Sequence, residues 1–159
     1  MTSYPAIIGR AENIDIVGLA LGVPSKIDTG AFRSAIHAQN IKIVKRAGVP
    51  TLVCELLGHP VSPVPRPFET TEFTELPVKN STGDVDVRYE VKMKIKIGSK
   101  VFLTSFSLSD RANNIYPVLV GRKALKDRFL VDVSKTSINR LELKKLKGVT
   151  SPEDEEDLE

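Results

Sequence analysis

The chain is poor in several residue types that support common functions. It has no Trp, one Cys and two His among 159 residues, and only 6% of its residues are aromatic. The single cysteine, Cys54, excludes a disulfide within the chain and fits a reducing cytoplasm. There is no His-Glu-x-x-His motif, and a catalytic zinc ion typically takes three protein ligands. The low aromatic content predicts a mainly aliphatic core. The absence of a zinc-binding motif and the small number of histidines predict no metal site.

Long apolar runs and nucleotide-binding loops are also missing. No stretch is long enough to span a bilayer, and residues 1–5 lack the basic and apolar regions of a signal peptide. No Walker-type Gly-x-x-x-x-Gly-Lys-Ser/Thr loop is present. These absences predict a cytoplasmic protein with no membrane contact and no cofactor.

Charge is distributed unevenly along the chain. There are 23 basic and 20 acidic residues, and residues 151–159 hold six of the acids and no base. Residues 1–150 therefore carry 23 bases against 14 acids, a net charge of +9. A basic body attracts polyanions, either nucleic acid or a carboxylate-rich peptide. The peptide is favoured, because no recognised nucleic-acid motif is present and stacking aromatics are few.

Hydrophobic patterning predicts a chain that is mostly β-strand. Residues 85–97 alternate apolar and polar side chains, which predicts a strand with one buried face, and Gly98-Ser99 predicts a turn into a second strand. Four prolines make residues 58–67 an extended surface loop or an edge. Further strands are expected at 14–17, 34–38, 41–45, 52–57, 73–78, 101–108, 118–120 and 129–133, with a turn at 22–24, a brief helix at 122–126, and a closing strand or short helix at 139–147. Residues 1–147 would then form one domain and residues 148–159 a disordered acidic tail.

Two short motifs lie about ninety residues apart. Ile27-Asp28-Thr29-Gly30-Ala31 closes an apolar strand, and Val118-Leu119-Val120-Gly121-Arg122 joins apolar residues to Gly-Arg. Either motif alone is a weak signal, because Asp-Thr-Gly also fits an ordinary turn. In this order they resemble the catalytic loop of aspartic peptidases and the segment that packs beside it. The resemblance implies an all-β, retropepsin-like (acid protease) closed barrel with one short helix after the Gly-Arg motif.

A closer resemblance spans roughly residues 7–137. It is carried by residues 26–38, 78–83, 108–111 and 116–125. These segments resemble a bacterial and archaeal family first labelled an ATP-dependent zinc protease. That family is now described as retropepsin-like and is associated with ATP-grasp ligases that add glutamates to a ribosomal protein. One departure is that Phe32-Arg33 stand where the commonest form of the family signature has Arg-Thr.

The resemblance assigns catalytic roles to individual residues. In an aspartic peptidase two carboxyls share one proton, so that one activates water and the other polarises the carbonyl. The chain has one Asp-Thr-Gly, so Asp28 would supply one carboxyl and a second copy of the chain the other, across a twofold axis. Thr29 would lock the loop across that axis, and Gly30 allows close backbone approach. Gly121 would pack against the loop, and Arg122 would pair with a nearby carboxylate.

The resemblance also implies a set of substrate contacts. Residues 80–83 resemble a flap tip that closes over a bound peptide, with a plain hairpin turn as the alternative. The expected contacts are Ala31 and Arg33 from the loop, Ser81, Thr82 and Gly83 from the tip, and Arg88 from the following strand. Lys79 and Arg111 are further candidate cations, and the alternative for each of the four cations is a solvated surface charge.

Three residues whose types can bind metals or act as nucleophiles are expected to have neither role. His37 should pack at a strand end, His59 should be exposed in the proline-rich loop, and Cys54 should be a small buried side chain.

The leading hypothesis is a homodimeric aspartic endopeptidase that acts on acidic peptides such as glutamate tails, with a glutamate ligase of the ATP-grasp class as a partner. The alternative is a weakly active or inactive module that binds acidic peptides or the ligase. Residues 153–159 resemble the same substrate class. They suggest an inhibitory segment that occupies a basic cleft, or simply a solubilising tail.

Overall fold

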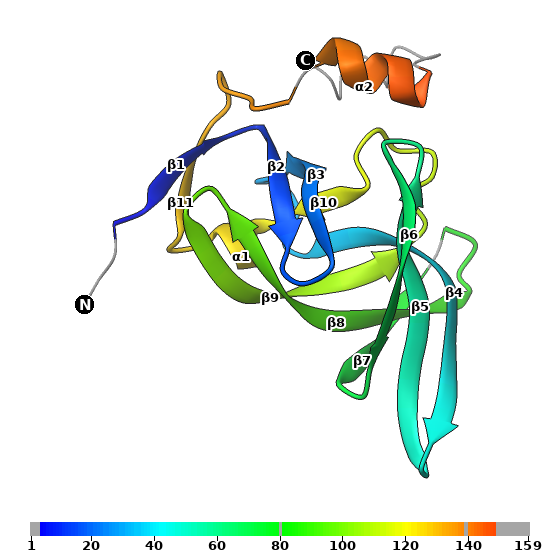
Figure 1. Cartoon of the computed structure of the whole chain (residues 1–159). Helices are drawn as coiled ribbons and strands as arrows, with labels where there is room; N and C mark the ends of the chain where they lie inside the picture. The colour runs from blue at the N-terminus through cyan, green and yellow to red at the C-terminus, as the bar shows by residue number, and fades with distance from the viewer. Residues whose placement is uncertain (1–3, 80, 139, 149–159) are drawn as a thin grey trace.

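The computed structural model describes residues 4–79, 81–138 and 140–148 (Figure 1). The acidic tail predicted for residues 148–159 lies outside the described residues from residue 149 onward. The elements are β1 (Ala6–Gly9), β2 (Ala11–Ile16), β3 (Ala20–Ile27), β4 (Ser34–Arg46), β5 (Val49–His59), β6 (Ser62–Thr70), β7 (Phe73–Lys79), β8 (Val85–Ile97), β9 (Lys100–Ser109), β10 (Val118–Val120), α1 (Arg122–Leu125), β11 (Phe129–Asp132) and α2 (Arg140–Lys147).

Six strands close into a barrel. Their hydrogen-bonded order is β10–β3–β2–β8–β9–β4, and β4 pairs with β10 to complete the ring. The β10–β3 and β4–β9 pairs are parallel, and the other pairs of the ring are antiparallel. The predicted all-β closed barrel with a short helix after Gly121 is confirmed. Neither helix in the described part of the chain is long and apolar enough to cross a bilayer.

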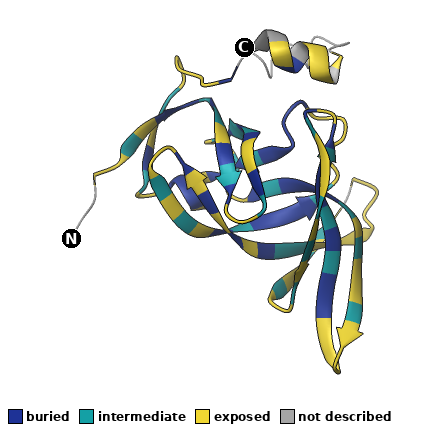
Figure 2. Ribbon diagram, viewed as in Figure 1, coloured by how far each residue is buried: buried dark blue, intermediate teal, exposed yellow. Residues whose placement is uncertain are grey.

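The barrel interior is almost entirely aliphatic, as the lack of Trp predicts. Phe106 is its main aromatic residue and has 0% exposure. Figure 2 shows the buried residues concentrated in the barrel, with exposed residues at the far end of the β4–β5 hairpin. Other fully buried side chains of the barrel strands include Ile14, Ile36, Ile95 and Ile97, and Leu52 and Leu56 on β5 belong to the same hydrophobic core.

Three strands extend the sheet beyond the barrel. The β4–β5 hairpin projects away from it, and β6 pairs with the outer side of β5, so it forms the end of the sheet order (Figure 1). The proline-rich segment is therefore an edge strand from Ser62 onward, one of its two predicted alternatives. Separately, β7 pairs with β8. The prolines of β6 are tolerated because an edge strand needs backbone donors on one side only.

Two expectations about the strands are wrong. The turn expected at residues 22–24 is part of β3. Gly22 has a φ of +63°, and its N–H donates to Asp15 Oδ1 at 2.9 Å, where the β2–β3 register shifts. The glycine therefore serves a β-bulge and not a turn.

The buried face expected over the whole of residues 85–97 begins only at Val91. Val85 and Val87 are 62% and 53% exposed. Here β8 pairs with β7 outside the barrel, so no core covers these side chains. In addition, residues 140–147 form a helix, which decides between the two structures considered for residues 139–147.

Candidate active site

The Asp28 loop begins where β3 ends beside β10. The Asp28 N–H donates to the Val120 carbonyl at 2.9 Å and so continues the parallel pairing of the two strands. The carboxylate oxygen Oδ1 accepts hydrogen bonds from Gly30 N–H at 2.8 Å and Ala31 N–H at 3.2 Å. The other oxygen, Oδ2, has no hydrogen-bond partner among the described residues. The loop thus holds a half-buried carboxylate in one orientation and leaves one oxygen available for chemistry.

The segment after β10 packs against this loop and forms hydrogen bonds to its backbone. Arg122 N–H donates to the Ala31 carbonyl at 2.8 Å, and Lys123 N–H donates to the Phe32 carbonyl at 3.0 Å. These bonds satisfy amides at the start of α1 that have no partner within the helix. A Cβ on Gly121 would lie 2.6 Å from the Arg33 carbonyl oxygen. Only glycine fits this contact, so Gly121 packs directly against the backbone of the loop.

Arg122 has a different partner from the one expected. Its Nη1 donates to the Thr29 carbonyl at 3.1 Å, and this backbone oxygen, not a carboxylate, is its side-chain contact among the described residues. The Thr29 hydroxyl has no hydrogen-bond partner in the same part of the chain. Its predicted bond across a twofold axis would need a second copy of the chain.

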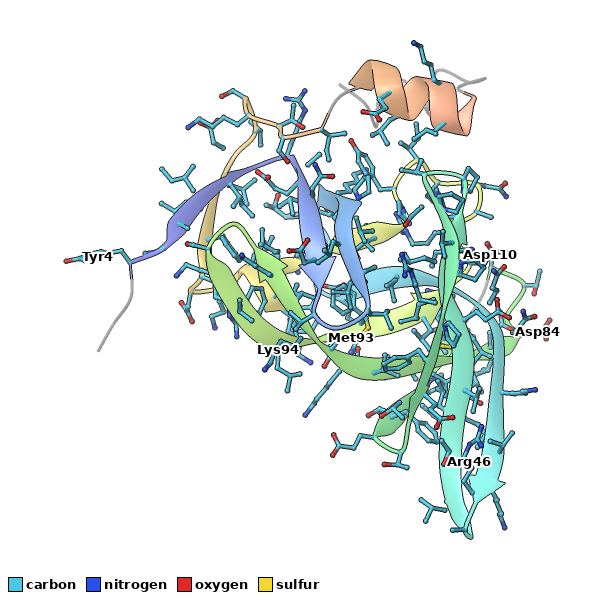
Figure 3. The ribbon with its side chains drawn as sticks, viewed as in Figure 1. Tyr4, Arg46, Asp84, Met93, Lys94 and Asp110 are labelled. Carbon is cyan, nitrogen blue, oxygen red and sulfur yellow. The ribbon has the colours of Figure 1, made fainter. Side chains whose placement is uncertain are left out.

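The β7–β8 hairpin faces the loop across a groove of about 310 Å³, which we call the loop–flap groove. The loop and β4 contribute Ala31, Arg33, Ser34 and Ala35, the hairpin contributes Leu76, Pro77, Val78 and Arg88, and Ser107 and Leu119 complete the lining. Three of the predicted substrate contacts, Ala31, Arg33 and Arg88, are therefore brought together. Ser81, Thr82 and Gly83 lie instead at the exposed hairpin tip, where Figure 3 labels Asp84. Asn80 is outside the described residues.

An ion pair connects the loop to the hairpin. Arg33 Nη1 lies 2.7 Å from Glu90 Oε2, and the two side chains are 46% and 12% exposed. Glu90 is not among the site residues predicted from the sequence. A signal was present, because Glu90 interrupts the basic residues on one face of β8, namely Arg88, Lys92, Lys94 and Lys96.

A second, larger hollow of about 670 Å³ lies on the α1 side of the loop. It is mostly apolar, and we call it the α1 hollow; its lining residues are Thr29, Phe32, Arg122, Lys123, Leu125, Lys126, Phe129, Leu130 and Val131. Phe32 and Leu130 are 53% and 60% exposed. No sequence pattern predicts this surface.

The two histidines lie together under the segment that connects β9 to β10. His37 lies on β4 and is buried, and its Nδ1 accepts a hydrogen bond from the Arg111 N–H at 2.9 Å. The prediction that His59 is exposed is wrong, because its exposure is 1%. His59 ends β5 and holds the same segment, with Nε2 at 2.8 Å from the Asn114 carbonyl and Nδ1 accepting the Val61 N–H. These bonds give both histidines structural roles.

Family comparison agrees with this geometry. A family model described as the retropepsin-like aspartic endopeptidase RimB matches residues 7–142. The chain belongs to the RimB-like family. A crystal structure of a protein of unknown function from Legionella pneumophila is similar to this RimB-like chain, with a TM-score of 0.68 and 32% identity. That similarity covers 82% of this chain and 95% of the other.

Curated relatives of this RimB-like chain carry the name of a ligase. A probable alpha-L-glutamate ligase from Shewanella halifaxensis is 33% identical to this chain over 142 residues. Another from Desulfotalea psychrophila is 31% identical to it over 121 residues. The matches cover 83% and 70% of this chain but only 31% and 25% of the relatives. The chain therefore spans less than a third of the length of these proteins.

The RimB-like site is built from carboxylates, cations and backbone groups. Within the described residues, no group of three or more His, Cys, Asp and Glu side chains is placed to hold a metal ion. The reactive group that the geometry presents most directly is the Asp28 carboxylate.

Proposed function

We propose that this RimB-like chain is an aspartic endopeptidase in which two copies of the chain each contribute Asp28. The orientation of the Asp28 carboxylate is the observation that carries the proposal. Two backbone N–H groups hold Oδ1, and Oδ2 has no partner among the described residues. In a dyad, one Asp28 would be ionised and take a proton from water, and the other would be protonated and polarise the scissile carbonyl. Thr29 and Gly30 would shape the loop around this pair.

The surface beside the loop supports a contact with a second copy. The α1 hollow reaches Thr29, and Phe32 and Leu130 expose apolar surface there. Ile7, which is 61% exposed, lies opposite Leu130 in the β1–β11 pair and extends the apolar surface. Contact between two such surfaces would remove apolar area from water and bring the two Asp28 loops together.

The charge of the loop–flap groove supports acidic substrates. Its lining includes Arg33 and Arg88 and no acidic residue. The relatives named probable alpha-L-glutamate ligases support a substrate that bears added glutamates, and a glutamate ligase as partner. We place this reaction in the cytoplasm, which the single buried cysteine fits.

Cleavage of an oligoglutamate-tailed peptide tests the proposal directly. Wild type and Asp28→Asn would be compared from about pH 4 to about pH 8, with products identified by mass spectrometry. We expect the variant to lose at least about 100-fold in rate, because a general acid–base pair contributes that much or more. Equal cleavage by the two proteins would overturn the proposal.

A second experiment tests the dimer. Leu130→Asp should shift the protein toward monomer in sedimentation equilibrium and lower the cleavage rate. Leu103→Asp is the matched control, because Leu103 is 56% exposed on β9 and does not line the α1 hollow. A wild type that stays monomeric at high concentration with peptide present would rule out a shared dyad.

A binding module for acidic peptides is the second candidate. It is favoured by the single Asp-Thr-Gly of the chain, because an isolated copy presents one carboxylate where the mechanism needs two. Peptide binding that survives Asp28→Asn, with no cleavage by wild type, would establish this function instead.

A further inference from the structure

The loop–flap groove has cationic donors that the rest of the described chain does not use. Arg88 is exposed and has no hydrogen-bond or ion-pair partner among the described residues. Arg33 uses Nη1 for Glu90, but a guanidinium has five N–H donors. The groove therefore presents two arginines to an anion and has no acidic residue in its lining.

The chain itself contains a segment with the complementary charge. Residues 153–159 carry six carboxylates in seven positions, namely Glu153, Asp154, Glu155, Glu156, Asp157 and Glu159. They follow the last described residue, Gly148, after a short connection. Eleven extended residues span up to about 36–40 Å, whereas a domain of this size has a radius of gyration of about 15 Å. The last residues of the segment can thus reach across their own domain, whereas Glu153 stays within about 16–18 Å of Gly148.

We propose that residues 153–159 bind in the loop–flap groove, on Arg33 and Arg88, and so compete with acidic substrates for the same site. A single exposed ion pair contributes little. Here several carboxylates share two arginines, and the covalent tether holds them at a high local concentration. The inference rests on the proposed function for its inhibitory consequence, but the binding itself does not require peptidase activity.

The test compares the wild-type chain with a full-length variant whose tail is neutral, E153Q/D154N/E155Q/E156Q/D157N/E159Q. The probe is a fluorescein-labelled peptide of residues 149–159, and its binding is followed by fluorescence anisotropy at low and high salt. The neutral-tail variant should bind the probe about threefold to tenfold more tightly, because a short tether gives an effective concentration in the millimolar range. Added salt should weaken the binding. Equal affinities, or no binding to either protein, would overturn the proposal.

A matched pair of substitutions locates the binding. In the neutral-tail background, Arg88→Gln should weaken probe binding several-fold. Lys94→Gln removes the same charge from the same strand, but Lys94 points away from the barrel and does not line the groove (Figure 3). It should leave the affinity unchanged. Equal losses in both variants would mean non-specific attraction to a basic surface and would overturn the assignment to the groove.

Failure of this inference can be told apart from failure of the proposed function. The affinities would also be measured in the Asp28→Asn background, where no cleavage is expected. If neither protein cleaves peptides but neutralising the tail still strengthens binding, the peptidase proposal fails and the tail contact stands. If the peptide is cleaved and the affinities are equal, only the tail contact fails.

Discussion

The Ser34 hydroxyl accepts a hydrogen bond from the Gly121 N–H at 3.0 Å, although the two residues lie 87 positions apart. Ser34 begins β4 at the exit of the Asp28 loop, and Gly121 precedes α1. The bond is buried, because Ser34 is only 2% exposed. It therefore joins the end of the Asp28 loop to the segment before α1. The bond holds the two motifs next to each other in the folded chain.

Replacing Ser34 by Ala should destabilise the fold. The Gly121 N–H would lose its partner inside the protein, which costs about 1–3 kcal/mol. We expect a melting temperature lower by several degrees, measured by differential scanning calorimetry. Ser99→Ala is the control, because Ser99 is exposed in the β8–β9 turn and the change should stay within about 0.5 kcal/mol. Equal melting temperatures for the two variants would contradict this role for Ser34.

Replacing Gly121 by Ala should have a larger effect. The new Cβ would lie 2.6 Å from the Arg33 carbonyl oxygen and 2.9 Å from that of Ala31, so the loop backbone must move. We expect a loss of about 3 kcal/mol or more in the free energy of unfolding, measured with urea.

Gly98→Ala separates this clash from the general cost of replacing a glycine. Gly98 has a φ of +58° and no atom within 4 Å of its added Cβ, so it should lose only about 1–2 kcal/mol for the left-handed backbone. A smaller loss at Gly121 than at Gly98 would show that the loop yields easily.

The stability of the protein should fall as the pH falls below about 6.5. Burial lowers the pKa of His37 below its ordinary 6.5; Asp110 opposes this shift, and Arg111 adds to it. The unfolded chain therefore binds a proton at a pH where the native His37 is still neutral. The stability that the neutral ring contributes is complete above 6.5 and is lost as the pH falls toward the folded pKa.

Thermal unfolding between about pH 7 and pH 5 checks this prediction. His37→Asn keeps an acceptor for the Arg111 N–H, because the Asn amide oxygen can take the position of Nδ1, and it removes the titrating ring. The variant should show a weaker pH dependence of the melting temperature than wild type. The same slope in both proteins would assign the pH dependence to other groups.

Cys54 should be unreactive in the folded protein. Burial, with a smaller contribution from Glu55, raises the pKa of its thiol to about 11, and the residue is 2% exposed. At about pH 8 we expect disulfide reagents to modify the native thiol at least about 100-fold more slowly than the thiol unfolded in guanidinium chloride, because the thiolate is the reacting species. Rapid modification of the native protein would mean that β5 opens readily.

Sequence patterns predicted secondary structure best where one strand meets one buried surface. The alternation in residues 85–97 located β8 correctly, but it could not show that Val85 and Val87 lie beyond the barrel. The glycine and proline at residues 22–24 signal a departure from regular structure, and a bulge and a turn give the same signal. The prediction that His59 is exposed was wrong for a similar reason. The proline after it indicates a loop, but tertiary contacts bury the ring.

The sequence by itself determined the strand-rich architecture, the Asp28 and Gly121 motifs and the basic body with its acidic segment. These features depend on local periodicity, short motifs and composition, which need no knowledge of distant neighbours. Only the tertiary structure decided that Glu90 holds Arg33, that Arg122 bonds to the Thr29 carbonyl and that Ser34 anchors Gly121. Each of these contacts joins residues more than fifty positions apart. Barrel closure brings them together, and no local pattern in the chain encodes that distance.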